Sequence, residues 1–171
     1  MSTIHKAVAA VSGLALAAGI GVIAGNGIAS AAPSLAPCQA SQLSVSLVGG
    51  YVGLGNRATD LVLTSSADCT VHGYPQLFTR VDGAECPVSA SQGPTYFRTD
   101  PGDHVMALNP GDRVVSQIAW HAGIANATPV GPLTVRLPDI DQPVAHDLDF
   151  HLDNQAGDFA VTAVGADASA H

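Results

Sequence analysis

The residues most able to do chemistry in this sequence lie in one short segment, residues 146–153 (HDLDFHLD). From Asp147 onward, acidic or imidazole side chains alternate with apolar ones. In a β-strand such alternation places the polar side chains on one face and the apolar ones toward a core. Carboxylates and imidazoles bind divalent cations, so Asp147, Asp149 and His151 are the candidate metal ligands.

The spacing of these residues argues against a complete metal site. Neighbours on one strand face lie about 6.7 Å apart, whereas ligand atoms lie roughly 2.0–2.6 Å from a bound cation. Asp147, Asp149 and His151 would therefore need donors from elsewhere, such as Asp139 or Asp141. We favour the alternative, a solvated strand face whose charges discourage pairing with other chains. No cofactor is expected.

The remaining motifs that resemble catalytic or binding signatures are incomplete. Residues 53–58 (GLGNRA) match a dinucleotide-binding pattern by letter, but strand-like residues follow where that motif requires a helix. The sequence contains no HExxH, CxxC or GxSxG pattern. We therefore expect a Gly-rich hairpin at 53–58, and a binding role rather than an enzymatic one.

The beginning of the chain has the features of a secretory leader. Lys6 precedes the uncharged run 7–24, and Ala29-Ser30-Ala31 supplies a small-x-small cleavage site. We predict a signal peptide over residues 1–31, with a retained anchor as the alternative. Residues 35–38 (LAPC) are a poor lipobox because Pro37 precedes the cysteine. The mature protein is thus expected to be secreted or associated with the cell envelope.

Length and charge limit the classes of partner. The 140 residues after the leader suffice for one domain. The whole chain has a formal net charge of −8, and loss of Lys6 with the leader makes it −9. This charge disfavours nucleic acid and anionic membrane surfaces. We expect a monomer that binds an unknown protein or envelope component, without stable membrane insertion after cleavage.

Beyond the leader, short runs of alternating residues predict β-strands. The clearest run is 114–120, with Val114, Ile118 and Trp120 on one face. Turn signals such as Asp82-Gly83 separate the runs about every ten residues. The pattern predicts an all-β, antiparallel, immunoglobulin-like β-sandwich of about eight strands. We assign residues 32–37 to a linker, 38–164 to the sandwich and 165–171 to a flexible tail.

Three cysteines follow the leader, so one disulfide can form and one thiol remains. We favour Cys38–Cys69, which closes a loop of about thirty residues and is worth roughly 3–4 kcal/mol. Cys69–Cys86 is the alternative. If the first pairing holds, Cys86 is free, and the neighbouring Glu85 disfavours its thiolate.

Two aromatic residues are expected to have structural roles. Tyr74, in the corner Gly73-Tyr74-Pro75, is expected to pack its ring and to bond the backbone through its hydroxyl. Trp120 is in phase with Ile118 and is expected to anchor the core.

Several motifs in order resemble a known family. They are Cys38, residues 43–46 (LSVS), 53–56 (GLGN), 61–75 (LVLTSSADCTVHGYP) and 107–114 (ALNPGDRV), with Trp120 beyond. Over roughly residues 38–137 the sequence resembles the DUF4232 family, secreted or lipid-anchored actinobacterial domains of unknown function. The resemblance implies a β-sandwich with Cys69 paired to Cys38, and it implies no activity. Ser65-Ser66 and the lack of cysteines after Cys86 depart from the family pattern.

These observations predict a secreted, non-catalytic β-sandwich module that binds an extracellular or envelope component. The alternative is a metal-binding protein or metal-dependent hydrolase that uses the Asp147/Asp149/His151 face.

Overall fold

The structure, a computed structural model, describes residues 34–123, 131–150 and 157–165. In this part of the chain β-strands dominate, and the one helical element is a short 3₁₀ turn, Ala40–Gln42. The strands are β1 (Leu43–Gly53), β2 (Asn56–Ser65), β3 (Cys69–Val71), β4 (Gln76–Val81), β5 (Ala84–Pro87), β6 (Ala90–Gln92), β7 (Met106–Leu108), β8 (Arg113–His121), β9 (Leu133–Arg136), β10 (Ala145–Leu148) and β11 (Gly157–Val161). No helix among the described residues is long and apolar enough to cross a membrane.

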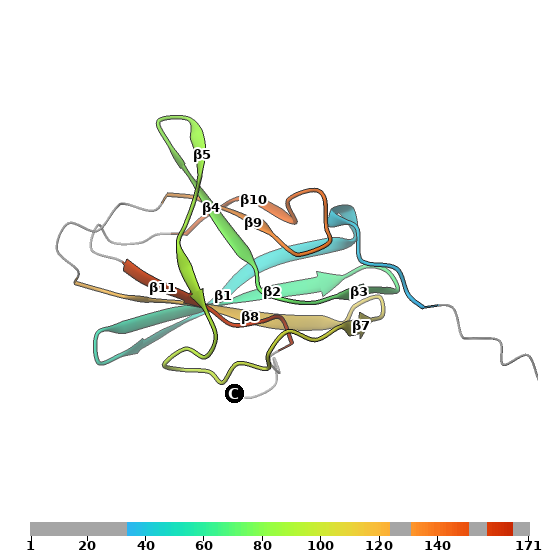
Figure 1. Cartoon of the computed structure of the whole chain (residues 1–171), viewed down its shortest axis with the longest axis horizontal. Coiled ribbons are helices and arrows are strands. Elements are labelled where there is room, and N and C mark those ends of the chain that lie inside the picture. Colours follow the sequence, from blue (N-terminus) through green and yellow to red (C-terminus); the bar gives the residue numbers. More distant parts are fainter. Residues whose placement is uncertain (1–33, 124–130, 151–156, 166–171) are drawn as a thin grey trace, which may run out of the picture. The chain divides into compact units, whose positions relative to one another are not determined.

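The strands form two main sheets and a small ribbon (Figure 1). One sheet has the order β1-β2-β8-β11-β6, the other β10-β9-β4-β5, and β3 pairs with β7. The predicted all-β sandwich is therefore confirmed. The strands beyond the expected eight include three of only three residues each, β3, β6 and β7. The β6–β11 pair is parallel, which the antiparallel prediction did not include.

The centre of the five-stranded sheet is the long antiparallel pair of β2 and β8, which runs in register from Asn56↔His121 to Thr64↔Arg113. Because side chains alternate between the two faces of a strand, those of Leu61, Leu63 and Ile118 point into the core between the sheets, where each is fully buried. The alternation predicted for residues 114–120 is confirmed. Trp120 packs against this core at its edge, with its ring 5.1 Å from that of Phe150.

The predicted disulfide joins Cys38 to Cys69. It ties the residues before β1 to the start of β3, where Cys38 N–H donates to Thr70 O and Thr70 N–H to Ala36 O, each at 2.9 Å. The covalent link and the hydrogen bonds fix this end of the domain. Cys86 lies on β5 as a free, half-buried thiol.

Two-residue turns close the hairpins β1–β2 and β4–β5. Leu54-Gly55 and Asp82-Gly83 all have positive φ, as the hairpin turn that matches strand twist requires. The Gly-rich hairpin expected at residues 53–58 is thus confirmed, and the segment is followed by strand β2 and not by the helix that a dinucleotide-binding motif requires.

Candidate functional site: an inter-sheet groove and three polar clusters

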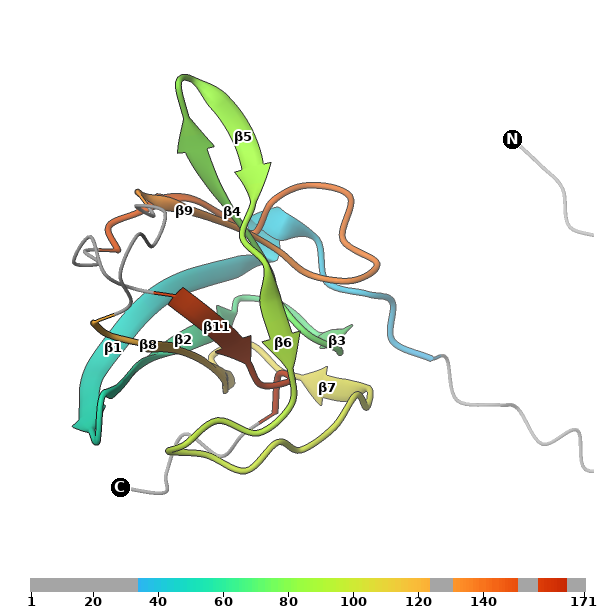
Figure 2. The ribbon, with the colours of Figure 1, turned by 60° about the vertical axis from the view of Figure 1, so that its left-hand side comes forward.

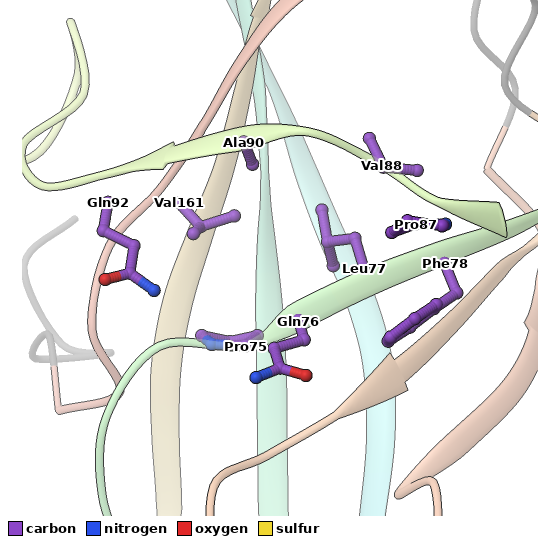
Figure 3. A pocket seen from close by; sticks show the side chains of 9 residues that line it. All are labelled: Pro75, Gln76, Leu77, Phe78, Pro87, Val88, Ala90, Gln92 and Val161. Carbon is purple, nitrogen blue, oxygen red and sulfur yellow. The ribbon is translucent and has the colours of Figure 1, made fainter.

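A groove opens where the chain crosses from one sheet to the other. Strands β4 and β5 pair as far as Val88, whose N–H donates to Leu77 O at 2.8 Å. Beyond that bond the chain leaves β4, and β6 joins β11 in the five-stranded sheet (Figure 2). We call the space between the diverging strands the inter-sheet groove. Its walls are Pro75, Gln76, Leu77, Phe78, Pro87, Val88, Ala90, Gln92 and Val161 (Figure 3).

The groove is small and mostly apolar. Its volume is about 170 Å³, below the roughly 300–1,000 Å³ of sites that enclose a drug-sized ligand. Ala90 and Leu77 face one another across it (Figure 3), while Gln76 and Gln92 carry amides at its exposed rim. No wall residue is charged. This space can take one apolar side chain, with amides available to bond the atoms around it.

A second hollow lies beside the disulfide. Residues 37–41 and 139–142 line a volume of about 540 Å³. Asp139 and Asp141 make its rim acidic, and Ile140 packs on the core beneath. Asp139 is already engaged, because His72 bonds its carboxylate. The hollow would suit a cationic or hydroxylated molecule.

His72 is held between two carboxylates. Its Nδ1 lies 3.0 Å from Asp103 Oδ1 and its Nε2 2.9 Å from Asp139 Oδ2. Both nitrogens can donate only when the ring is protonated. The hydrogen bond to Asp103, and then that to Asp139, raise the pKa of His72 against the opposing effect of partial burial. The imidazolium thus joins the β3–β4 turn to two separate loops.

A buried ion pair fixes residues 93–105 to the outer face of the five-stranded sheet. Arg98 Nε lies 3.0 Å from Asp60 Oδ1, and Arg98 Nη2 lies 2.6 Å from Asp60 Oδ2. Both side chains are 8% exposed. The Tyr51 hydroxyl and the Gln117 amide also donate to Asp60, at 2.8 and 3.0 Å. Burial alone would raise the pKa of Asp60, but these hydrogen bonds outweigh it and hold that pKa below its usual value.

Tyr74 takes part in a related contact. Its hydroxyl donates to Asp100 Oδ2 at 2.6 Å, and Asp100 Oδ1 accepts the Ala163 N–H at 2.8 Å. The Tyr74 hydroxyl was expected to hydrogen-bond the backbone directly, but it bonds the Asp100 carboxylate, which in turn accepts a hydrogen bond from the backbone. Gly73 has a positive φ and lies so close to Pro138 that a Cβ there would clash at 2.8 Å. Pro75 lines the inter-sheet groove.

The Asp/His face predicted near the C-terminus is not a continuous strand. β10 ends at Leu148, and its pairing with β9 is irregular between Ala145 and Leu148. Asp147 has a φ of 48°, which breaks the alternation that was to align it with Asp149. His151 lies outside the described residues. Among the residues that are described, no three His, Cys, Asp or Glu side chains form a metal-binding group.

Sequence reasoning missed the groove and the clusters at Asp60 and His72, because their members are far apart in the chain. A usable signal existed at Asp60, a charged residue directly before the apolar run Leu61–Leu63. Such a carboxylate has to be paired when its strand is central and covered. Nothing local identified Arg98, 38 residues away, as the partner.

Comparison with known proteins identifies a family but no function. Residues 38–168 match the family described as domain of unknown function DUF4232. No curated protein and no solved structure matches the chain. The match covers most of the sequence and includes the disulfide, the groove and the polar clusters. The chain therefore belongs to the DUF4232 family of domains of unknown function.

Proposed function

We propose that the protein is an exported, non-catalytic binding module that holds a component of the cell envelope or extracellular space in the inter-sheet groove. The observation that carries the proposal is the groove itself, an uncharged, open space with apolar walls and two rim amides. It lies between strands whose positions the two sheets fix, so it is formed before a ligand arrives. Preformed sites of this kind bind without ordering a loop.

The polar clusters support this proposal because each has a structural task. Arg98 and Asp60 attach one covering segment, Tyr74 and Asp100 attach its end, and His72 joins two loops. Several serine hydroxyls donate to backbone carbonyls: Ser65 to Ala67, Ser66 to Gln42, Ser91 to Phe159 and Ser116 to Thr162. These interactions stabilise a rigid platform. The disulfide supports residence outside the reducing cytoplasm.

In the test, culture filtrate and envelope extract from the producing cells are passed over three immobilised proteins, the wild type and two variants. Ala90→Leu fills the groove, and Ser46→Leu adds the same side chain at an exposed position of β1, the opposite edge of that sheet. We expect a component retained by the wild type and Ser46→Leu but lost with Ala90→Leu. Retention of nothing, or of the same material by all three, would contradict the proposal. Each variant is first checked for the disulfide and for native circular dichroism.

A further inference from the structure

The groove has an unpaired strand edge beside it. In the five-stranded sheet β6 is the last strand and pairs only with β11. The register places Ala90 opposite Phe159 and Gln92 opposite Val161, and Gly93 N–H donates to Val161 O at 3.0 Å. In this parallel pattern the N–H and C=O of Ser91 face β11. The N–H and C=O of Ala90 and Gln92 therefore face away from the sheet.

Nothing in the described part of the chain hydrogen-bonds these outward groups. Ser89, Ser91 and Gln92 are exposed, which agrees with an open edge. The groups of Ala90 and Gln92 are two residues apart, the spacing at which an added strand makes its hydrogen bonds. They offer two donors and two acceptors to a neighbouring chain.

The edge of the other sheet shows how such a position is usually protected. On β5, the two-residue turn makes Val81 and Ala84 a hydrogen-bonded pair, so the backbones of Glu85 and Pro87 face outward. Pro87 has no N–H to donate, and Glu85 places a charge there; both features discourage strand pairing. Residues 86–97 around β6 contain no charged side chain, in a chain of net charge −8. The edge at β6 is short but has neither safeguard within Ala90–Gln92.

The remaining edges of the two main sheets, β1 and β10, contact each other. Within the described structure, β6 is an edge strand that combines unpaired backbone groups with a groove. Side chains of an added strand would alternate between solvent and the space between the sheets. The Ala90, Leu77 and Val161 side chains line that space. One inward side chain of an added strand would reach it.

We propose that β6 and the inter-sheet groove accept an extended polypeptide segment, which adds as a strand and inserts one apolar side chain into the groove. This inference rests on the proposed function, because it names the class of ligand for that same site. Main-chain hydrogen bonds to Ala90 and Gln92 supply the docking, and the groove selects the inserted residue. The groove volume of about 170 Å³ favours a single aliphatic side chain. The lack of charge on residues 86–97 selects an uncharged segment.

The test uses ¹⁵N-labelled mature protein and short capped peptides of alternating threonine and serine. The central residue is valine, leucine, isoleucine or phenylalanine, with aspartate as the control. We expect at least one apolar peptide to bind with a Kd below about 1 mM, to shift the amide signals of Ala90 and Gln92, and to slow their hydrogen exchange. The aspartate peptide is expected to leave them unchanged. No binding by any member, or shifts confined to other surfaces, would overturn the proposal.

Two further measurements identify the binding mode. The backbone amides of an added strand face β6 at every second position. N-methylation of those amides should abolish binding, whereas N-methylation of the intervening amides should leave binding unchanged. Gln92→Pro removes one outward N–H without breaking a bond of the fold, and Gln92→Ala keeps that N–H. We expect the proline variant to lose peptide binding and the alanine variant to retain it. Equal binding by both variants would contradict docking to the edge.

Failure here can be separated from failure of the proposed function. If the component that the immobilised protein retains resists protease and its retention still depends on Ala90, the binding module stands and the polypeptide ligand is wrong.

Discussion

Replacing Arg98 with methionine should be among the most damaging single changes to the described structure. The methionine keeps much of the apolar volume of the arginine but leaves the Asp60 carboxylate buried without its counter-ion. Arg98 donates two hydrogen bonds to Asp60, at 3.0 and 2.6 Å, and both side chains are 8% exposed. Hydrogen bonds to charged groups are worth about 1.5–3 kcal/mol each, and breaking a buried pair on one side costs roughly 3–5 kcal/mol. We expect a loss in that range in the free energy of unfolding.

Urea denaturation followed by tryptophan fluorescence measures this loss, with the slope m used to check that the transition stays two-state. The double variant Asp60→Asn/Arg98→Met should be more stable than Arg98→Met alone, because no buried charge remains unpaired. Arg136→Met is the matched control. It removes an exposed pair with Glu85, with side chains 38% and 36% exposed, and should cost about 1 kcal/mol or less. If Arg98→Met cost no more than Arg136→Met, burial would not strengthen the Arg98–Asp60 pair as proposed.

Three further predictions concern pH, the disulfide and metal. The pKa of His72 is raised in the folded state above its ordinary 6.5, so its contribution to the free energy of unfolding is complete below pH 6.5 and is lost as the pH rises through the folded pKa. Urea denaturation at a series of pH values should show a loss of about 1 kcal/mol, which His72→Gln removes and His121→Gln keeps. A loss that His72→Gln leaves unchanged would contradict the role of His72. Replacing Cys38 and Cys69 with alanine should cost about 3–4 kcal/mol from the 31-residue separation, whereas Cys86→Ala should change the unfolding midpoint little; equal losses would contradict this. Calcium, zinc and EDTA should leave the melting temperature unchanged, since no ligand set occurs among the described residues; a shift of several degrees would reinstate a metal site.

Local patterns predicted the parts of the fold that depend on neighbours in sequence. Alternation along residues 114–120 places Ile118 inward. Asp82 and Gly83 close a hairpin, and both adopt the positive φ that a two-residue hairpin turn requires. The pairing of Cys38 with Cys69, favoured among the possible bridges, also holds.

What the sequence could not predict depends on contacts between distant residues. His72 and Asp139 are 67 positions apart, and Arg98 and Asp60 are 38 apart, so no periodicity connects them. The groove exists because β5 and β6 belong to different sheets, and the parallel pairing of β6 with β11 cannot be inferred from three residues of strand. The strand face considered at Asp147 and Asp149 is interrupted for a different reason: aspartate tolerates positive φ, so an alternating pattern can contain a bulge.

The outward backbone groups of Ala90 and Gln92 on β6 have no hydrogen-bond partner in the described part of the chain. Amide hydrogen exchange of the mature protein, resolved by residue, tests this without any ligand. We expect Ser91 and Gly93, whose amides face β11, to be protected, while Ala90 and Gln92 exchange far faster. Protection of Ala90 and Gln92 equal to that of Ser91 would show that this edge is already occupied, and would contradict an open strand edge beside the groove.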